Sequence, residues 1–139
     1  MTNQELIELA LKARETAYAP YSNHPVGAAL LTESGKVFLG CNIENAGYSP
    51  GNCAERTAVF KAVSDGETEF DKIAIVGGLK TRKELPICPP CGVCRQVLME
   101  FCDPETFIII LGTNIPGRFE EYTLKDLLPF GFGPKSLMN

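Results

Sequence analysis

Two short cysteine motifs constrain the fold of this 139-residue chain more than any other feature of its sequence. One is Cys53-Ala-Glu-Arg, and the other is Cys91-Gly-Val-Cys94, which follows a proline pair. Each begins a segment whose apolar residues recur at helical spacing, so three thiols are predicted in the first turns of two helices. The partial positive charge of a helix N-terminus favours the thiolate that a metal needs. A fold that brings these two helix starts together therefore creates a metal site.

The donor set predicts a catalytic zinc rather than a harder ion. Thiolates select zinc or iron–sulfur clusters, and three protein ligands leave the fourth tetrahedral position of zinc open for water. Glu55 follows the first cysteine by two residues, close enough to exchange a proton with that water as a general acid and base. Three thiolates on a dication leave one excess negative charge, which Arg56 can offset by donating hydrogen bonds to sulfur. We expect one zinc per chain, held by Cys53, Cys91 and Cys94.

A closed, purely structural zinc site is the alternative that the motifs leave open. Cys88 extends the second motif to Cys-x-x-Cys-x-x-Cys, and four thiolates are typical of structural zinc. The two prolines after Cys88 restrict it to extended backbone, which favours a direction away from the helix, and a closed site leaves Glu55 and Arg56 without a role. A thioredoxin-like redox pair uses two thiols, so that interpretation leaves the third thiol without a role. Cys41 and Cys102 are expected to be small buried hydrophobic residues.

The hydrophobic pattern of the chain predicts one α/β domain over residues 1–139. Apolar spacing and two Thr-x-x-acid capping boxes indicate helices over 3–17, 53–64, 91–101 and 123–128, and β-prone runs indicate strands over 26–31, 36–42, 72–77 and 106–111. The order α-β-β-α-β-α-β-α predicts a mixed β-sheet sandwiched between helices, a three-layer α/β/α arrangement.

Charge and composition exclude several classes of partner. Thirteen Lys and Arg against 17 Asp and Glu give a net charge of −4, and neither tryptophan nor a basic stripe is present, which argues against nucleic acid. No apolar run approaches the roughly 18 residues of a membrane span. The N-terminal residues lack a basic segment followed by an apolar core, so we expect a cytoplasmic protein. Six cysteines in a reducing compartment are explained by a metal better than by three disulfides.

Taken together, the cysteine motifs and their flanking segments resemble a known enzyme family. The zinc signature is that of nucleoside and nucleobase deaminases. Further segments resemble the small homotetrameric, zinc-dependent cytidine deaminases in particular: Tyr21-Ser, Val26-Gly-Ala-Ala-Leu-Leu, Gly40-Cys-Asn-Ile-Glu-Asn45, Leu127-Leu-Pro and Phe132-Gly-Pro. The resemblance covers nearly the whole chain. It implies hydrolytic deamination of cytidine, and of deoxycytidine, to uridine or deoxyuridine and ammonia in pyrimidine salvage.

The resemblance also implies which residues bind the nucleoside. It assigns Asn42 and Glu44 to the ribose hydroxyls and places Ala54 among the substrate-binding residues. Phe132 is implied to reach from a neighbouring subunit of a homotetramer and to pack on the base. His24 stands where the family more often has a phenylalanine that forms a wall against the pyrimidine. An imidazole can stack there, shift the base, or make affinity depend on pH.

Two other functions share these motifs. A blasticidin-type deaminase performs the same chemistry on a modified cytosine nucleoside, although the segment Asn42-Ile-Glu-Asn45 favours cytidine. A structural zinc module for assembly binds its metal through four thiolates and leaves Glu55 dispensable.

Overall fold

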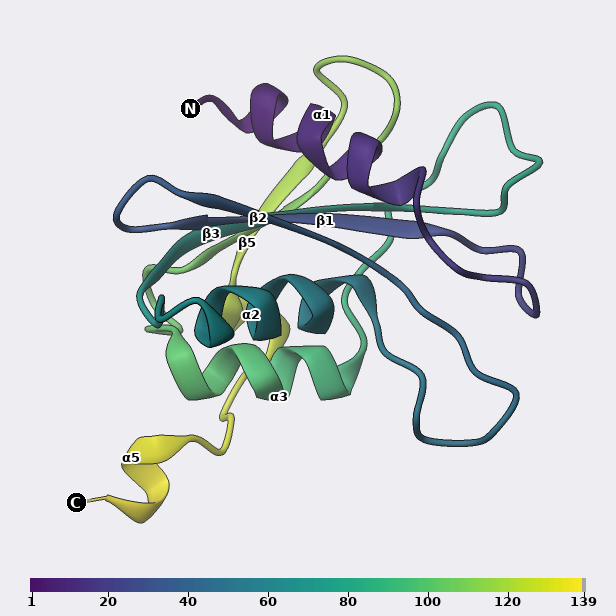
Figure 1. The fold of residues 1–139 in the computed structure, drawn as a ribbon. Helices are drawn as coiled ribbons and strands as arrows, with labels where there is room; N and C mark the ends of the chain where they lie inside the picture. The colour runs from purple at the N-terminus through teal and green to yellow at the C-terminus, as the bar shows by residue number, and fades with distance from the viewer. Residues whose placement is uncertain (139) are drawn as a thin grey trace.

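The computed structural model describes residues 1–138, in which helices cover both faces of one sheet (Figure 1). In chain order the elements are α1 (Asn3–Arg14), β1 (Val26–Thr32), β2 (Val37–Cys41), α2 (Ala54–Ser64), β3 (Phe70–Gly77), α3 (Gly92–Phe101), β4 (Ile108–Leu111), β5 (Glu120–Thr123), α4 (Leu124–Leu127) and α5 (Pro134–Leu137).

The sheet is mixed, as predicted. Its strand order is β2-β1-β3-β4-β5, with β3 and β4 parallel and every other neighbouring pair antiparallel. The parallel pair is joined through α3, the crossover helix that such a connection requires. The predicted fold class, a mixed sheet between helical layers, is confirmed.

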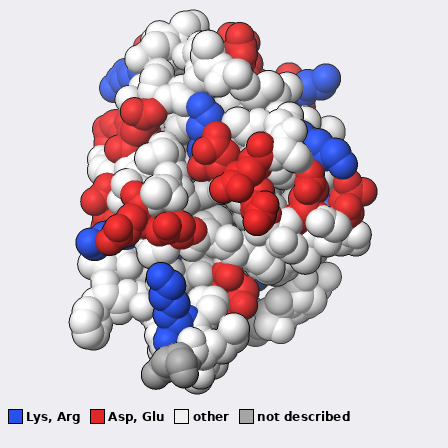
Figure 2. All heavy atoms as spheres, turned by 90° about the vertical axis from the view of Figure 1, so that its left-hand side faces the viewer, with Lys and Arg blue, Asp and Glu red and all other residues white. Residues whose placement is uncertain are grey.

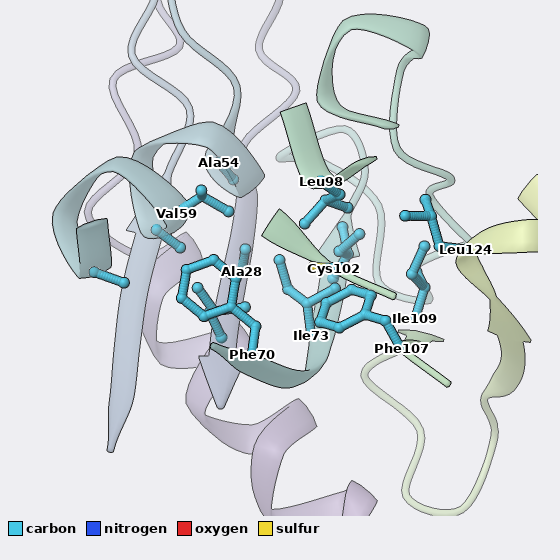
Figure 3. Packing of buried hydrophobic residues seen from close by; sticks show 14 of the residues in the cluster. Ala28, Ala54, Val59, Phe70, Ile73, Leu98, Cys102, Phe107, Ile109 and Leu124 are labelled. Carbon is cyan, nitrogen blue, oxygen red and sulfur yellow. The ribbon is translucent and has the colours of Figure 1, made fainter. Parts of the chain in front are cut away.

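Two hydrophobic cores lie on opposite faces of the sheet, because the central strands are buried on both sides. Successive strand residues point to opposite faces, so Ile73 and Ile75 of β3 face one core while Ala74 faces the other. Figure 3 shows the larger core, in which Ile73 and Phe70 of β3 lie near Leu98 of α3. The smaller core packs α1 against the other face.

The predicted first helix, 3–17, is wrong at its C-terminal end. The α-helix ends at Arg14, and the amide of Ala17 then bonds the carbonyl of Arg14 in a tighter turn. The amide of Tyr18 bonds the carbonyl of Asn42 at 2.9 Å. The chain therefore leaves the helix to pair with the segment after β2.

Two short elements were not predicted. β5 has the polar sequence Glu-Glu-Tyr-Thr and pairs with β4. It is an edge strand with a neighbour on one side only, so its sequence needs no alternation of apolar and polar residues. α5 lies in the Gly-, Pro- and Phe-rich segment after residue 128, for which the sequence predicts no helix or strand. The other predicted boundaries agree with the structure to within two residues.

Gly40 in β2 positions the helix that carries the first cysteine motif. A Cβ atom at Gly40 would lie 2.3 Å from the carbonyl oxygen of Ala54 and 2.5 Å from the amide nitrogen of Ala58. Only a residue without a side chain permits this approach of α2 to the sheet. Figure 1 shows that α2 and α3 run side by side and begin at the same end of the molecule.

At the opposite end of the molecule, which faces the viewer in Figure 2, the charged side chains are mostly acidic. Lys36 lies among the acidic groups there, 3.7 Å from Asp65 and 4.0 Å from Glu67. Among the residues described, none of the helices combines the length and apolar character needed to cross a bilayer.

Candidate active site

Three thiols converge where α2 and α3 begin. Cys53 is the N-cap of α2, Cys91 is the N-cap of α3, and Cys94 lies in the first turn of α3. Neither N-cap thiol is used to cap its own helix, so both are free to face a ligand. The three sulfurs all lie within 4.8 Å of one another, and those of Cys53 and Cys91 are 3.7 Å apart. Tetrahedral zinc with bonds of about 2.3 Å to sulfur places its ligands about 3.8 Å apart, so this cluster fits zinc.

Electrostatics at the cluster favours a thiolate. Hydrogen bonding from the Cys94 thiol, and then from Arg56, lowers the pKa of Cys53 to about 5 against the opposing effect of burial. Its bond to Cys53 correspondingly raises the pKa of Cys94. Nη2 of Arg56 lies 3.3 Å from the sulfur of Cys53, while its buried Nε has no hydrogen-bond partner within residues 1–138. The guanidinium thus lies against sulfur, where it can balance excess negative charge.

Glu55 is buried in the first turn of α2, beside this cluster. Only 4% of its surface is exposed, whereas an unpaired carboxyl ordinarily avoids the interior. Burial, reinforced by the nearby Cys53 thiolate, raises its pKa from the usual 4.5 to about 7. A carboxyl with a pKa near neutrality can both accept and donate a proton at physiological pH.

A pocket of about 560 Å³ opens above the carboxyl and the thiols. It brings together most of the residues that the sequence singles out, although they come from separate segments of the chain. Its lining includes His24, Asn42, Glu44, Cys53, Ala54, Glu55, Arg56 and Cys91. Cys94 lies buried behind this surface. The volume is in the range of pockets that hold small ligands.

Asn42 is held in one orientation by the backbone that leads into β1. Its Oδ1 accepts from the amide of Val26 at 2.9 Å, and its Nδ2 donates to the carbonyl of His24 at 3.0 Å. A side-chain amide has two donor hydrogens and two acceptor lone pairs. One donor and one acceptor therefore remain for a ligand.

Glu44 accepts hydrogen bonds from the loop before β1. Its Oε1 accepts from the amides of Tyr21 and Ser22, at 3.0 and 3.1 Å, and its Oε2 accepts from the Ser22 hydroxyl. The Ser22 hydroxyl is the largest cause that holds the pKa of Glu44 below its usual range. The pocket thus presents an ionised carboxylate at this side.

Phe132 and Cys88, which the sequence analysis singled out, lie outside the cluster of three thiols. Phe132 is 59% exposed and does not line the pocket of its own chain; its carbonyl accepts a hydrogen bond from Gln96 at 2.8 Å. Cys88 lines the pocket, but among the described residues the convergent cluster contains only the other three thiols. Burial raises the pKa of Cys88 to about 11, so it stays a thiol at neutral pH.

Sequence reasoning gave no role to several residues of the pocket wall. Ser22, Asn45, Tyr48 and Pro89 all line it. Short polar loop residues carry no periodicity or ligand spacing, so the only available signal was the resemblance around Tyr21-Ser and Asn45.

Comparisons with known proteins agree with this geometry. The family model for "Cytidine and deoxycytidylate deaminase zinc-binding region" matches residues 1–110. A cytidine deaminase of Sporosarcina psychrophila is 50% identical over 137 residues, covering 99% of this chain and 96% of that protein. One from Halalkalibacterium halodurans is 48% identical over 95% of each chain.

A solved structure supports the same assignment. The crystal structure of cytidine deaminase from Burkholderia pseudomallei superimposes with a TM-score of 0.84 at 51% identity, covering 95% of this chain and all of that one. A blasticidin-S deaminase of Bacillus cereus is less similar, at 29% identity over 131 residues. The chain therefore belongs to the family of zinc-binding cytidine and deoxycytidylate deaminases.

Proposed function

We propose that this protein hydrolyses cytidine, and also deoxycytidine, to uridine or deoxyuridine and ammonia. One observation carries the proposal: the buried Glu55 carboxyl and three convergent thiols share a pocket with the polar groups of Asn42 and Glu44. The pocket thus combines proton transfer and metal chemistry at one end with groups suited to sugar hydroxyls at the other.

In the proposed reaction, Glu55 moves the protons. When bound by Cys53, Cys91 and Cys94, zinc supplies a Lewis acid that lowers the pKa of water towards neutrality. Glu55 accepts a proton as the water oxygen attacks carbon 4 of the cytosine ring. It returns that proton to the adjacent ring nitrogen. It then takes the proton of the new hydroxyl group on carbon 4 and passes it to the amino group. The carbon–nitrogen bond breaks, ammonia leaves, and carbon 4 becomes a carbonyl.

Other residues hold the nucleoside in place for this transfer. Asn42 and Glu44 bind the ribose hydroxyls, each of which both donates and accepts a hydrogen bond. His24 and Ala54 line the part of the pocket assigned to the base. Arg56 offsets the excess charge of the thiolates through its contact with Cys53.

The residues 1–139 act as one catalytic domain in this proposal, and four copies form the enzyme. Support for assembly comes from exposed apolar side chains near the C-terminus: Phe130, Phe132, Leu137 and Met138. In the tetramer, Phe132 reaches the base in a neighbouring pocket. Free thiols at all six cysteines support a reducing, cytoplasmic location, where the reaction serves pyrimidine salvage.

Ammonia release by the purified, zinc-loaded protein tests the proposal. Cytidine, deoxycytidine, free cytosine and blasticidin S are offered separately, and ammonia and the ultraviolet spectrum of the product are followed. We expect cytidine to exceed cytosine at least about a hundredfold in kcat/KM, because cytosine leaves the hydrogen-bonding groups of Asn42 and Glu44 unsatisfied. Equal efficiency on cytosine refutes their assignment, and faster release from blasticidin S refutes the proposed substrate.

A further inference from the structure

Ser22 makes contacts at the pocket that the proposed reaction does not use. Its hydroxyl donates to Oε2 of Glu44, and its amide donates to Oε1 of the same carboxylate at 3.1 Å. An ionised carboxylate only accepts hydrogen bonds, so the hydroxyl proton of Ser22 must point towards Glu44. Ser22 therefore donates hydrogen bonds to both carboxylate oxygens of Glu44, the residue assigned to the ribose.

The same hydroxyl also accepts a hydrogen bond. The amide of His24 donates to Oγ of Ser22 at 3.0 Å, and the carbonyl of His24 accepts from Nδ2 of Asn42 at 3.0 Å. Glu44, Ser22, His24 and Asn42 thus form one continuous hydrogen-bonded chain along the pocket wall. Ser22 is the link that joins the two polar residues assigned to the sugar.

The contacts of Glu44 leave it little freedom and little spare capacity. A carboxylate offers about four acceptor positions, and the loop occupies three of them, from the amides of Tyr21 and Ser22 and from the Ser22 hydroxyl. Without the hydroxyl, Oε2 has no partner among the residues that the structure describes, and the carboxylate can turn about its last side-chain bond. The position that remains for a ligand then loses its fixed direction.

We propose that Ser22 is a positioning residue for the nucleoside sugar, whose hydroxyl fixes the Glu44 carboxylate to receive a ribose hydroxyl. This inference rests on the proposed function, because it assumes that a nucleoside occupies the pocket. It assigns Ser22 no part in proton transfer, which predicts an effect on KM with little effect on kcat.

The test compares S22A and S22T with the wild-type holoenzyme on two substrates. Cytidine carries the ribose hydroxyls, whereas 2′,3′-dideoxycytidine does not. S22T keeps the hydroxyl, and the exposure of Ser22 leaves room for the added methyl group. S34A is the matched control, because Ser34 also donates to a glutamate, Glu67, but lies outside the pocket. Circular dichroism and zinc content verify that each variant is folded and loaded.

We expect S22A to raise KM for cytidine about tenfold, the order expected for a partly exposed hydrogen bond to a charged group, with kcat within about twofold of wild type. KM for dideoxycytidine should stay unchanged in S22A, and S22T and S34A should keep the wild-type values. An unchanged KM for cytidine in S22A overturns the inference. So does an equal rise for both nucleosides, which indicates a merely structural role, or a failure of S22T to restore KM.

Equilibrium binding separates this inference from the proposed function. Calorimetry measures uridine and 2′,3′-dideoxyuridine binding to the same zinc-loaded proteins, without turnover. If wild type deaminates cytidine but S22A shows no sugar-dependent loss, only the role of Ser22 is wrong. If wild type neither deaminates cytidine nor binds uridine, the proposed function fails and the inference fails with it.

Discussion

At the scale of single residues, the buried Glu55 carboxyl is the most informative group in the molecule. Burying an unpaired carboxylate lowers the free energy of unfolding by several kcal/mol. The fold nevertheless buries Glu55 beside the thiols. Its pKa is raised to about 7, with burial as the largest cause and the Cys53 thiolate adding to it. Such burial destabilises the folded chain, and a pKa near neutrality is what the proposed proton transfer by Glu55 requires.

The raised pKa makes a prediction about the stability of the metal-free protein. Between pH 4.5 and about 7 the unfolded chain releases the Glu55 proton while the folded chain keeps it. The contribution of Glu55 to the free energy of unfolding therefore falls as the pH rises through this window. The glutamine of E55Q does not titrate, so its contribution to the free energy of unfolding does not fall with pH. The free energy of unfolding of E55Q should therefore exceed that of wild type by up to about 3 kcal/mol at pH 8, and the two should be equal near pH 4.

Urea unfolding of both reduced, metal-free proteins at the two pH values measures this difference. Using the difference between E55Q and wild type removes the titration of the thiols, which both proteins share. A stability difference that is the same at pH 4 and pH 8 contradicts the shifted pKa.

The three-thiol site predicts which cysteines are needed to retain zinc. C91S removes a member of the convergent cluster and should lose most of its bound zinc on dialysis against a weak chelator. C88S is the matched control, because Cys88 lines the same pocket outside the cluster, and it should keep one zinc per chain. X-ray absorption of wild type should find three sulfurs and one lighter atom. Zinc loss in C88S, or four sulfurs, supports the closed structural site instead.

The sequence predicted much of this site because its chemistry is encoded locally. Cys53 and Glu55 share one turn, and Cys91 and Cys94 share another, so spacing alone places them. The link from Ser22 to Glu44 joins residues 22 positions apart, and no periodicity indicates it. Hydrogen bonds between loops depend on tertiary packing, which a single sequence does not display.

At the scale of elements, the site depends on how closely α2 approaches β2. The helix starts at Cys53 and Cys91 were predictable, but their convergence depends on the sheet beneath them. Gly40 is the point of contact, where the backbones of strand and helix meet without an intervening side chain. This contact fixes the height of α2 above the sheet and, with it, the position of Cys53 and Glu55.

Adding one methyl group at this contact should disturb both stability and the metal site. In G40A the new Cβ would lie 2.3 Å from the carbonyl oxygen of Ala54, an overlap with backbone that only a shift of α2 relieves. We expect a loss of about 3 kcal/mol in the free energy of unfolding, together with weaker zinc binding. G92A is the control, because no atom of the described part of the chain outside the local helix backbone lies within 4 Å of a Cβ at that position, even though Gly92 adjoins Cys91.

Thermal and urea unfolding, with zinc titration by a competing chelator, check both variants. G92A should be as stable as wild type or slightly more stable, since alanine favours the helix. Wild-type stability and zinc affinity in G40A would show that α2 does not depend on this contact.

The elements that the sequence missed are those that tertiary contacts create. Strands β1 and β3 are apolar and were predicted, whereas β5 is polar because it pairs at an exposed edge. The residue at which α1 ends, Arg14, also makes contacts with distant parts of the chain. Its side chain donates hydrogen bonds to the carbonyls of Pro25 and Gly78, at 2.9 and 2.8 Å. Helical periodicity continues past this point, so it could not reveal the boundary.

At the scale of the whole molecule, the exposed apolar C-terminal segment predicts assembly. Phe130 is fully exposed and Phe132 is 59% exposed, an arrangement that favours an interface between copies of the chain. Light scattering should give a mass close to four times the 15.1 kDa chain. F132A should raise KM for cytidine about tenfold, the order of a lost aromatic stack on a base.

Mixed oligomers test whether Phe132 acts across the interface. A preparation that combines F132A and E55Q chains contains sites with Glu55 from one copy and Phe132 from another. These sites should restore part of the activity at low cytidine concentration, relative to either variant alone. A fully active monomer, or no recovery on mixing, contradicts the shared site.

The central claim is that Glu55 moves protons in a zinc-dependent deamination of cytidine, and turnover of E55Q tests it most directly. The amide cannot accept the proton of the attacking water, whereas the thiols that hold the metal are untouched. We predict that E55Q keeps one zinc per chain while kcat for ammonia release from cytidine falls by about three orders of magnitude. Near-wild-type turnover in zinc-loaded E55Q would contradict the mechanism.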